Sequence, residues 1–190
     1  MGNIVQFGRS GDRDIEWRVL EVKDEKCLLI AEKDYHFGSH FGYREDILWE
    51  PWGSSKLRKV LNGKFIEETF LPEEQAILQK ECVCYDDNAG HDPFKPTYTY
   101  WGGANETYDK VFILSKDEAL KYFKNDSSRK LESYLLKKDG TAYLSEWVLR
   151  TKGNRCTPVV VKYNGEIDDE RDTVYRNAEV RPAMWIKIKP

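Results

Sequence analysis

The sequence predicts an α+β fold in which one domain, residues 1–190, has a largely antiparallel twisted sheet flanked by helices. Three observations predict this class. Apolar residues alternate over 15–19 and run continuously over 27–31, as expected of a half-buried and a central strand. Segments with helical periodicity and capping residues follow from residue 53 onward. The last residues, 180–190, alternate again and predict a closing strand.

Size and composition fit one compact domain. The chain has 190 residues, of which 40% are hydrophobic and 33% charged, with a net charge of -3. This mixture is too aromatic for a disordered chain, and its interspersed charges give no reason to expect nucleic acid or an anionic membrane as a partner. We find no apolar segment near the ~20 residues of a membrane span and no secretory signal, so a cytoplasmic location is the default expectation.

Four cysteines, Cys27, Cys82, Cys84 and Cys156, do not predict a metal site. Cys82 and Cys84 are separated by one residue, whereas zinc knuckles separate each pair by two and need a second pair. We therefore expect reduced thiols that act as small buried hydrophobic side chains, with no structural metal and no cofactor.

The first 85 residues predict strands followed by helices. Residues 4–7 form a short strand, and the polar turn 24–26 joins the strands 15–19 and 27–31. Three helices are expected next. Their features are a Ser54 or Ser55 N-cap with a stop at Asn62-Gly63, a second helix over 64–70, and a third over 71–80 that begins with a proline and two acids.

The central part alternates between regular and irregular segments. We predict a strand over 81–85, an irregular stretch over 86–108 and a strand over 109–115. Ser115 and Glu118 have the spacing of a capping box that opens a helix, and a further short helix is expected over 129–136.

The last third predicts a strand over 157–163, a hairpin turn at Asn164-Gly165 and a short return arm over 166–169. The closing strand follows after an acidic turn. We find no internal repeat and no linker.

Several sequence blocks together resemble a bacterial family of uncharacterised domains, DUF6273. They are Ile15-x-Trp17-x-Val19-Leu20, Trp52-x-x-Ser55-x-Leu57-Arg58-x-x-Leu61-Asn62-x-x-Phe65, Asp109-x-Val111-Phe112-x-Leu114-Ser115-x-x-Glu118-x-x-x-Tyr122, Trp147-x-Leu149-Arg150 and Val180-Arg181-Pro182-Ala183-Met184-Trp185-Ile186.

The second half is also similar in style to C-type-lectin-like domains of the formylglycine-generating-enzyme kind, and this resemblance implies a C-type-lectin-like fold in the C-terminal half. The chain departs from the DUF6273 pattern at Thr151-Lys152-Gly153 and at Glu179, which stands where a glycine is usual. The resemblance implies a fold and supplies no reaction.

The function that we expect is non-catalytic binding of a ligand or partner, either a carbohydrate or a protein. Aromatic rings can stack on sugars or anchor a protein, and arginine forks can bind carboxylate or phosphate. The expected binding face consists of Tyr100, Trp101, Trp147, Arg150 and Arg181.

Structural roles compete with this interpretation. Trp17, Trp147 and Trp185 are large enough to serve as core residues. Arg58 and Arg181 are expected to pair with acids inside the fold.

Two further functions stay open. One is an enzyme, with or without a metal ion, that uses the loop side chains His36, His40, His91 and Asp92. The glycines between His36 and His40 argue against a helix that would place both on one face, and no histidine lies in a recognisable nucleophile motif. The other function is that of a structural module within a larger assembly.

Overall fold

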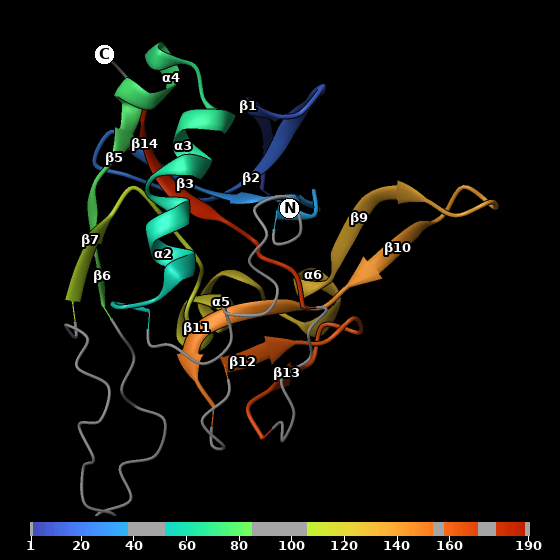
Figure 1. Cartoon of the computed structure of the whole chain (residues 1–190). Coiled ribbons are helices and arrows are strands. Elements are labelled where there is room, and N and C mark those ends of the chain that lie inside the picture. The colour runs from blue at the N-terminus through green and yellow to red at the C-terminus, as the bar shows by residue number, and fades with distance from the viewer. Residues whose placement is uncertain (1, 38–51, 85–105, 154–157, 171–177, 189–190) are drawn as a thin grey trace, which may run out of the picture.

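The computed structural model describes residues 2–37, 52–84, 106–153, 158–170 and 178–188 (Figure 1). These residues form a mostly β protein with a few short helices. The strands are β1 (Ile4–Ser10), β2 (Arg13–Lys23), β3 (Lys26–Ala31), β4 (Lys33–Asp34), β5 (Leu78–Gln79), β6 (Glu81–Cys84), β7 (Glu106–Asp109), β8 (Val111–Phe112), β9 (Leu131–Leu136), β10 (Ala142–Ser145), β11 (Trp147–Lys152), β12 (Pro158–Val161), β13 (Ile167–Asp168) and β14 (Ala183–Lys187). The helices are α2 (Lys56–Leu61), α3 (Lys64–Thr69), α4 (Pro72–Ile77), α5 (Lys116–Tyr122) and α6 (Asp126–Arg129).

The closing strand β14 is the centre of the main sheet. The strand order is β1-β2-β3-β14-β5, and β8 also pairs with β14. Ala183 lies opposite Ile30 on β3 and opposite Phe112 on β8, and every pairing in this sheet is antiparallel. The prediction of a strand near the end of the chain is therefore confirmed, and residues close to the C-terminus connect three separate parts of the sequence.

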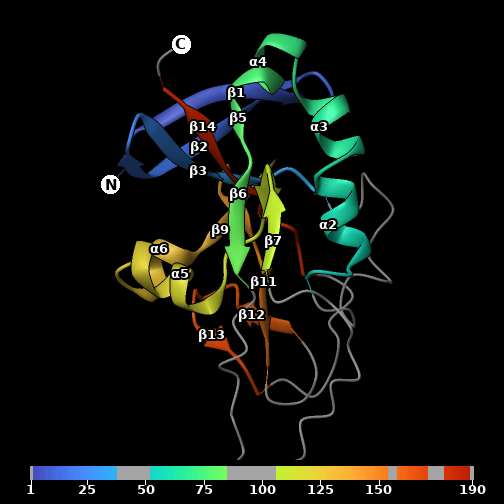
Figure 2. The same ribbon diagram turned by 90° about the vertical axis from the view of Figure 1, so that its left-hand side faces the viewer.

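The remaining strands form smaller sheets in the described parts of the chain. Their orders are β10-β9-β4, β11-β12-β13 and β6-β7. Pairing is antiparallel except between β4 and β9, which run parallel. The prediction of one sheet thus needs correction, because the β structure is divided, whereas its largely antiparallel character is confirmed. The β9–β10 hairpin projects from the body (Figure 1), and Figure 2 shows α2 and α3 on one side of the molecule and α5 and α6 on the other.

Local capping and turn signals correctly predicted several elements. Ser55 accepts a hydrogen bond from the Arg58 N–H at the start of α2, and Ser115 with Glu118 forms the expected capping box of α5. Gly165 has a φ of 90° in the turn between β12 and β13, a conformation that suits glycine.

Two predicted segments were wrong. Residues 129–136 do not form a helix, because α6 ends at Arg129 and β9 then pairs with both β4 and β10. This strand pairing outweighs the local helical preference of a Leu-rich segment. The strand expected over 109–115 is divided between β7 and β8, and β7 begins within the stretch that was expected to be irregular.

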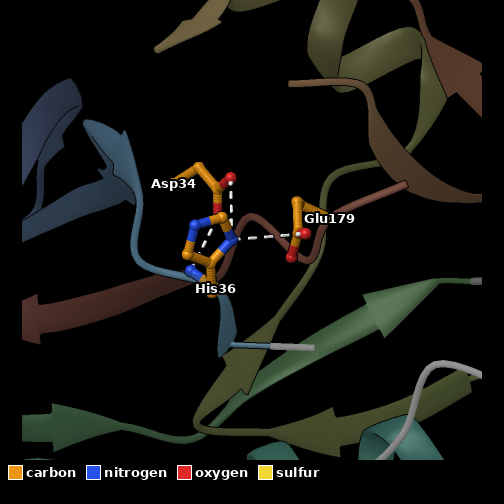
Figure 3. A group of neighbouring side chains, drawn as sticks. All are labelled: Asp34, His36 and Glu179. Carbon is orange, nitrogen blue, oxygen red and sulfur yellow. Dashed lines mark hydrogen bonds and ion pairs between the residues drawn. The ribbon is translucent and has the colours of Figure 1, made fainter. Parts of the chain in front are cut away.

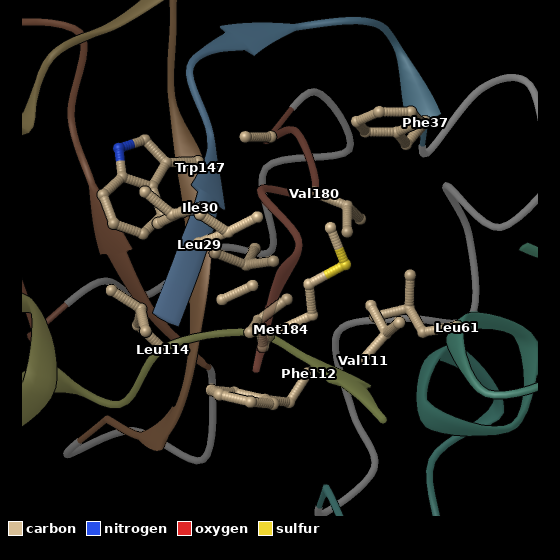
Figure 4. Close-up of a cluster of buried hydrophobic side chains, with 14 of the residues drawn as sticks. Leu29, Ile30, Phe37, Leu61, Val111, Phe112, Leu114, Trp147, Val180 and Met184 are labelled. Atoms are coloured by element: carbon tan, nitrogen blue, oxygen red, sulfur yellow. The ribbon is translucent and has the colours of Figure 1, made fainter. Parts of the chain in front are cut away.

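The described residues share one hydrophobic core (Figure 4). Trp17, Trp147 and Met184 are completely buried, whereas Trp185 is partly buried. Cys27 is buried as predicted, but Cys82 is exposed on β6, so the prediction of four buried thiols was wrong at this position. No helix in the described ranges is long and apolar enough to cross a membrane.

Candidate functional site

The residues of the predicted binding face divide into two groups. Tyr100 and Trp101 lie outside the described residues. Trp147, Arg150 and Arg181 are all buried. These three side chains therefore do not form the exposed binding face that we expected. The part of that face formed by Tyr100 and Trp101 stays a prediction.

Trp147 has a structural role at the start of β11. Its indole Nε1 donates to the carbonyl oxygen of Arg129 at 3.0 Å, and its ring meets that of Phe123 edge-on at 6.2 Å between centroids. The alternative that this tryptophan belongs to the core is confirmed.

Arg181 is buried against two aromatic rings. Its guanidinium carbon lies 5.0 Å from the ring centroid of Trp147 and 5.2 Å from that of Phe123. Nε donates to the carbonyl of Ala31 at 2.8 Å. Burial lowers the pKa of Arg181 to about 9. The expected acid partner is not found among the described residues, since backbone carbonyls and ring faces stabilise this cation.

Arg150 and Arg58, two further arginines singled out in the sequence, are each held by an acid. Arg150 donates from Nη1 to Glu118 at 2.5 Å and to the carbonyl of Ile113 at 2.7 Å. Arg58 donates from Nε to buried Asp109 at 2.7 Å, which confirms the predicted internal pair. Both arginines thus tie a helix to an adjacent segment.

Of the residues expected for a metal-assisted enzyme, His40, His91 and Asp92 lie outside the described residues. His36 is described and lies beside two carboxylates that sequence reasoning did not select. Figure 3 shows its imidazole between Asp34 and Glu179. Nδ1 is 3.4 Å from Asp34 Oδ2 and 3.4 Å from Glu179 Oε1, and one ligand atom from each residue lies within 4.8 Å of the others.

Asp34 is fixed at the base of the β9–β10 hairpin. It ends β4, where it lies opposite Ser133 of the parallel strand β9. Its Oδ1 accepts the backbone N–H of His36 at 2.7 Å, and its Oδ2 accepts the hydroxyl of Ser145 on β10 at 2.6 Å. The side chain is completely buried, so both oxygens are held in place by partners from the fold.

His36 has a left-handed backbone conformation, with a φ of 56°. Such values are uncommon outside glycine, although His, Asn and Asp tolerate them best. The ring contacts Tyr134 of β9 edge-on at 5.5 Å between centroids. Because 31% of the side chain is exposed, a ligand can approach it from solvent.

Glu179 reaches the cluster from the segment before β14. Its N–H donates to the carbonyl of Glu146 at 2.7 Å, and its carbonyl accepts the N–H of Val148 at 3.1 Å. These two bonds form a short parallel bridge beside Trp147. The carboxylate is almost completely buried, with 5% of the side chain exposed.

We call Asp34, His36 and Glu179 the carboxylate–histidine site. Two buried carboxylates concentrate negative charge, and a neutral imidazole adds a nitrogen lone pair. Asp34 has no lysine or arginine within ion-pair distance in the part of the chain that the structure describes. Burying a carboxylate without a counter-charge is costly, so the burial of Asp34 favours a cation beside it.

Sequence reasoning missed Asp34 and gave Glu179 no function. Two signals could have found them. Asp34 and His36 are separated by one residue in a segment that follows a central strand, and Glu179 is an acid immediately before the apolar start of the closing strand. Their convergence across 143 positions is visible only in three dimensions.

The fold and the site together define a mainly antiparallel β domain with a partly exposed histidine between two buried carboxylates. The chain matches the family described as "Domain of unknown function (DUF6273)" over residues 25–188, and it belongs to that family. No curated protein and no solved structure matches it.

Proposed function

We propose that this chain is a non-catalytic binding domain whose recognition site accepts a cation at Asp34, His36 and Glu179. The observation that carries the proposal is the convergence of two buried carboxylates on one partly exposed imidazole. A cation that enters this site gains charge-assisted contacts in surroundings where water screens them weakly.

The position of the site supports a binding role. It lies at the base of the projecting β9–β10 hairpin, which carries several exposed apolar side chains: Leu135, Leu136, Tyr143 and Leu144. Consecutive strand residues face opposite sides, so these side chains lie on both faces of the hairpin. They make the hairpin a candidate for contacts with a partner whose cationic group binds at its base.

The same proposal includes three expectations from the sequence. They are a C-type-lectin-like second half, a bacterial origin of the family, and an aromatic loop face with Tyr100 and Trp101. A carbohydrate or protein ligand fits it, since aromatic rings bind both. A module within a larger assembly is also compatible with it.

A panel of cations tests the proposed function. The unfolding temperature of the full chain would be measured with magnesium, calcium, manganese, zinc, arginine and spermidine, each compared with a double variant, Asp34→Asn with Glu179→Gln. We expect at least one cation to stabilise the unmodified chain and to have no effect on the double variant, because binding to the folded state raises stability. If none distinguishes the two proteins, the proposed function is wrong.

An enzyme is the second candidate, and one observation favours it. Asp34 lies close enough to His36 Nδ1 to orient the imidazole, and a carboxylate-oriented imidazole is a common general base. Hydrolysis of a panel of chromogenic esters and phosphate esters, measured for the unmodified chain and for His36→Asn, would test it. Turnover that the substitution abolishes would replace the non-catalytic proposal.

A further inference from the structure

We infer that the cation is a divalent transition-metal ion of the zinc class, bound by His36 Nδ1 and by one oxygen each of Asp34 and Glu179. This inference rests on the proposed function and names the ligand of the same site. Three independent features support it: the separations between the donor atoms, their chemical types and the charge of buried Asp34.

The separations fit a small tetrahedral ion. With ligands at about 2.0–2.1 Å, neighbouring donors in a tetrahedral zinc site are about 3.4 Å apart. Nδ1 of His36 is 3.4 Å from both Asp34 Oδ2 and Glu179 Oε1. The third separation, between the two carboxylates, is at most 4.8 Å. Two of the three edges therefore already have the required length, and a side-chain rotation of Glu179 can shorten the third.

The donor types select among divalent ions. Calcium and magnesium prefer sites built from oxygen alone and need six or more ligands or several waters. An imidazole nitrogen suits zinc, copper, iron and nickel instead. A site with one imidazole and two carboxylates, three protein ligands in all, leaves a fourth position for water or for a group of a bound partner. The partial exposure of His36 allows such a group to approach.

A divalent ion supplies the counter-charge that buried Asp34 lacks. No lysine or arginine in the described ranges lies within ion-pair distance of this carboxylate. A cation is favourable here because a buried carboxylate without a counter-charge is costly.

Ser145 acts as a positioning residue. Its hydroxyl donates to Asp34 Oδ2, and outer-shell hydrogen bonds of this kind orient metal ligands. The hairpin strand β10 would thereby contribute to metal affinity without a ligand of its own.

Isothermal titration of the full, chelator-treated chain with zinc chloride tests the inference. We expect one zinc ion per chain. Asp34→Asn, Glu179→Gln and His36→Asn should each lower the affinity by more than the about 10- to 100-fold that loss of an outer-shell partner causes, and Ser145→Ala should lower it by about 10-fold. Asparagine is chosen at position 36 because it tolerates the left-handed backbone there. Asp14→Asn, at a carboxylate that is 60% exposed in a surface ion pair, is the matched control and should leave zinc affinity unchanged.

Cobalt supplies a second measurement. Cobalt(II) in place of zinc should give the strong visible absorption of a four-coordinate ion, and the Asp34→Asn, Glu179→Gln double variant should lose it. That double variant keeps every cysteine and histidine, so zinc held by other donors would bind it equally well, and this result would overturn the inference. Selective binding of calcium, magnesium or an organic cation would overturn the metal assignment and leave the proposed function standing. Absence of binding by any cation would remove both.

Discussion

Asp109 offers a direct test of what fixes α2 to the rest of the fold. This carboxylate is 1% exposed and accepts three hydrogen bonds, from Arg58 Nε at 2.7 Å, Trp52 Nε1 at 3.0 Å and Thr107 Oγ1 at 2.5 Å. Asp109→Asn replaces one acceptor oxygen by an NH₂ group, which would face a donor and leave the Arg58 guanidinium without its counter-charge.

The expected destabilisation is about 3 kcal/mol. Breaking a buried ion pair costs about 3–5 kcal/mol, and the lower end applies because the Arg58 side chain is 27% exposed and keeps part of its hydration. For a domain of this length, about 3 kcal/mol corresponds to a fall of about 6–12 °C in Tm. Urea unfolding monitored by tryptophan fluorescence measures the free energy, and calorimetry measures the Tm.

Two comparisons make this prediction refutable. Asp14→Asn removes an exposed partner of Arg9 and should change stability by less than about 1 kcal/mol. A double-mutant cycle with Arg58→Met should give a coupling energy of about 1–3 kcal/mol. If Asp109→Asn is no more destabilising than Asp14→Asn, Asp109 does not hold α2 as argued.

Three further substitutions have clear expected outcomes. Arg181→Lys should destabilise the fold by about 2–3 kcal/mol in urea unfolding, because lysine lacks the planar guanidinium that packs against two rings and donates to carbonyls; no change would contradict this role. The Tyr122 hydroxyl donates to Glu21 and is the largest cause that lowers the pKa of Glu21. A carboxyl whose pKa is lowered in the folded state stabilises the fold above its ordinary pKa of 4.5, and this stabilisation is lost as the pH falls through the folded-state pKa. Tyr122→Phe should therefore cost about 1 kcal/mol at pH 7 and progressively less below pH 4.5. A difference in stability that does not depend on pH would refute this linkage. Gly165→Ala would place a methyl group 1.8 Å from the carbonyl oxygen of Asp126 at a φ of +90°, so a loss of about 3 kcal/mol or more is expected in the same unfolding assay, and a stability equal to that of the unmodified chain would show that this turn can rearrange.

The elements that the sequence predicted well are those with a local physical cause. Ser55 and Ser115 cap helices with their own side chains, and Asn164-Gly165 supplies the positive φ that a tight hairpin requires. Each signal acts within a few residues, so no knowledge of the rest of the chain is needed. The closing strand β14 was also predicted, but its burial does not alternate, since Ala183 and Met184 are both completely buried and Trp185 and Ile186 are both partly buried.

The elements that it missed depend on distant partners. Residues 131–136 form a strand because β4, about 100 positions earlier in the chain, and β10 both pair with it. The same limit applies to buried polar side chains. Arg150 and Arg181 are residues of a type that often binds ligands, yet each has its partners inside the fold. Arg150 donates to a carbonyl and to Glu118. Arg181 donates to a carbonyl and packs against aromatic rings. Composition shows that an arginine needs partners, but it does not show whether those partners are internal or belong to a ligand.

The carboxylate–histidine site illustrates the same limit from the opposite direction. Asp34 and His36 were adjacent to an element that the sequence predicted, and Glu179 was recognised as a departure from the family pattern. Neither observation had meaning alone, because a carboxylate on a strand end is ordinarily solvated. The β4–β9 pairing buries Asp34, and the bridge between Trp147 and Glu179 brings the second carboxylate to the same imidazole. Burial is what makes these two acids candidates for the proposed cation site. If the proposed cation site is correct, a DUF6273 domain with glycine at the position of Glu179 should bind a cation more weakly here, because only two of the three ligands remain, and zinc titration of such a domain would test this.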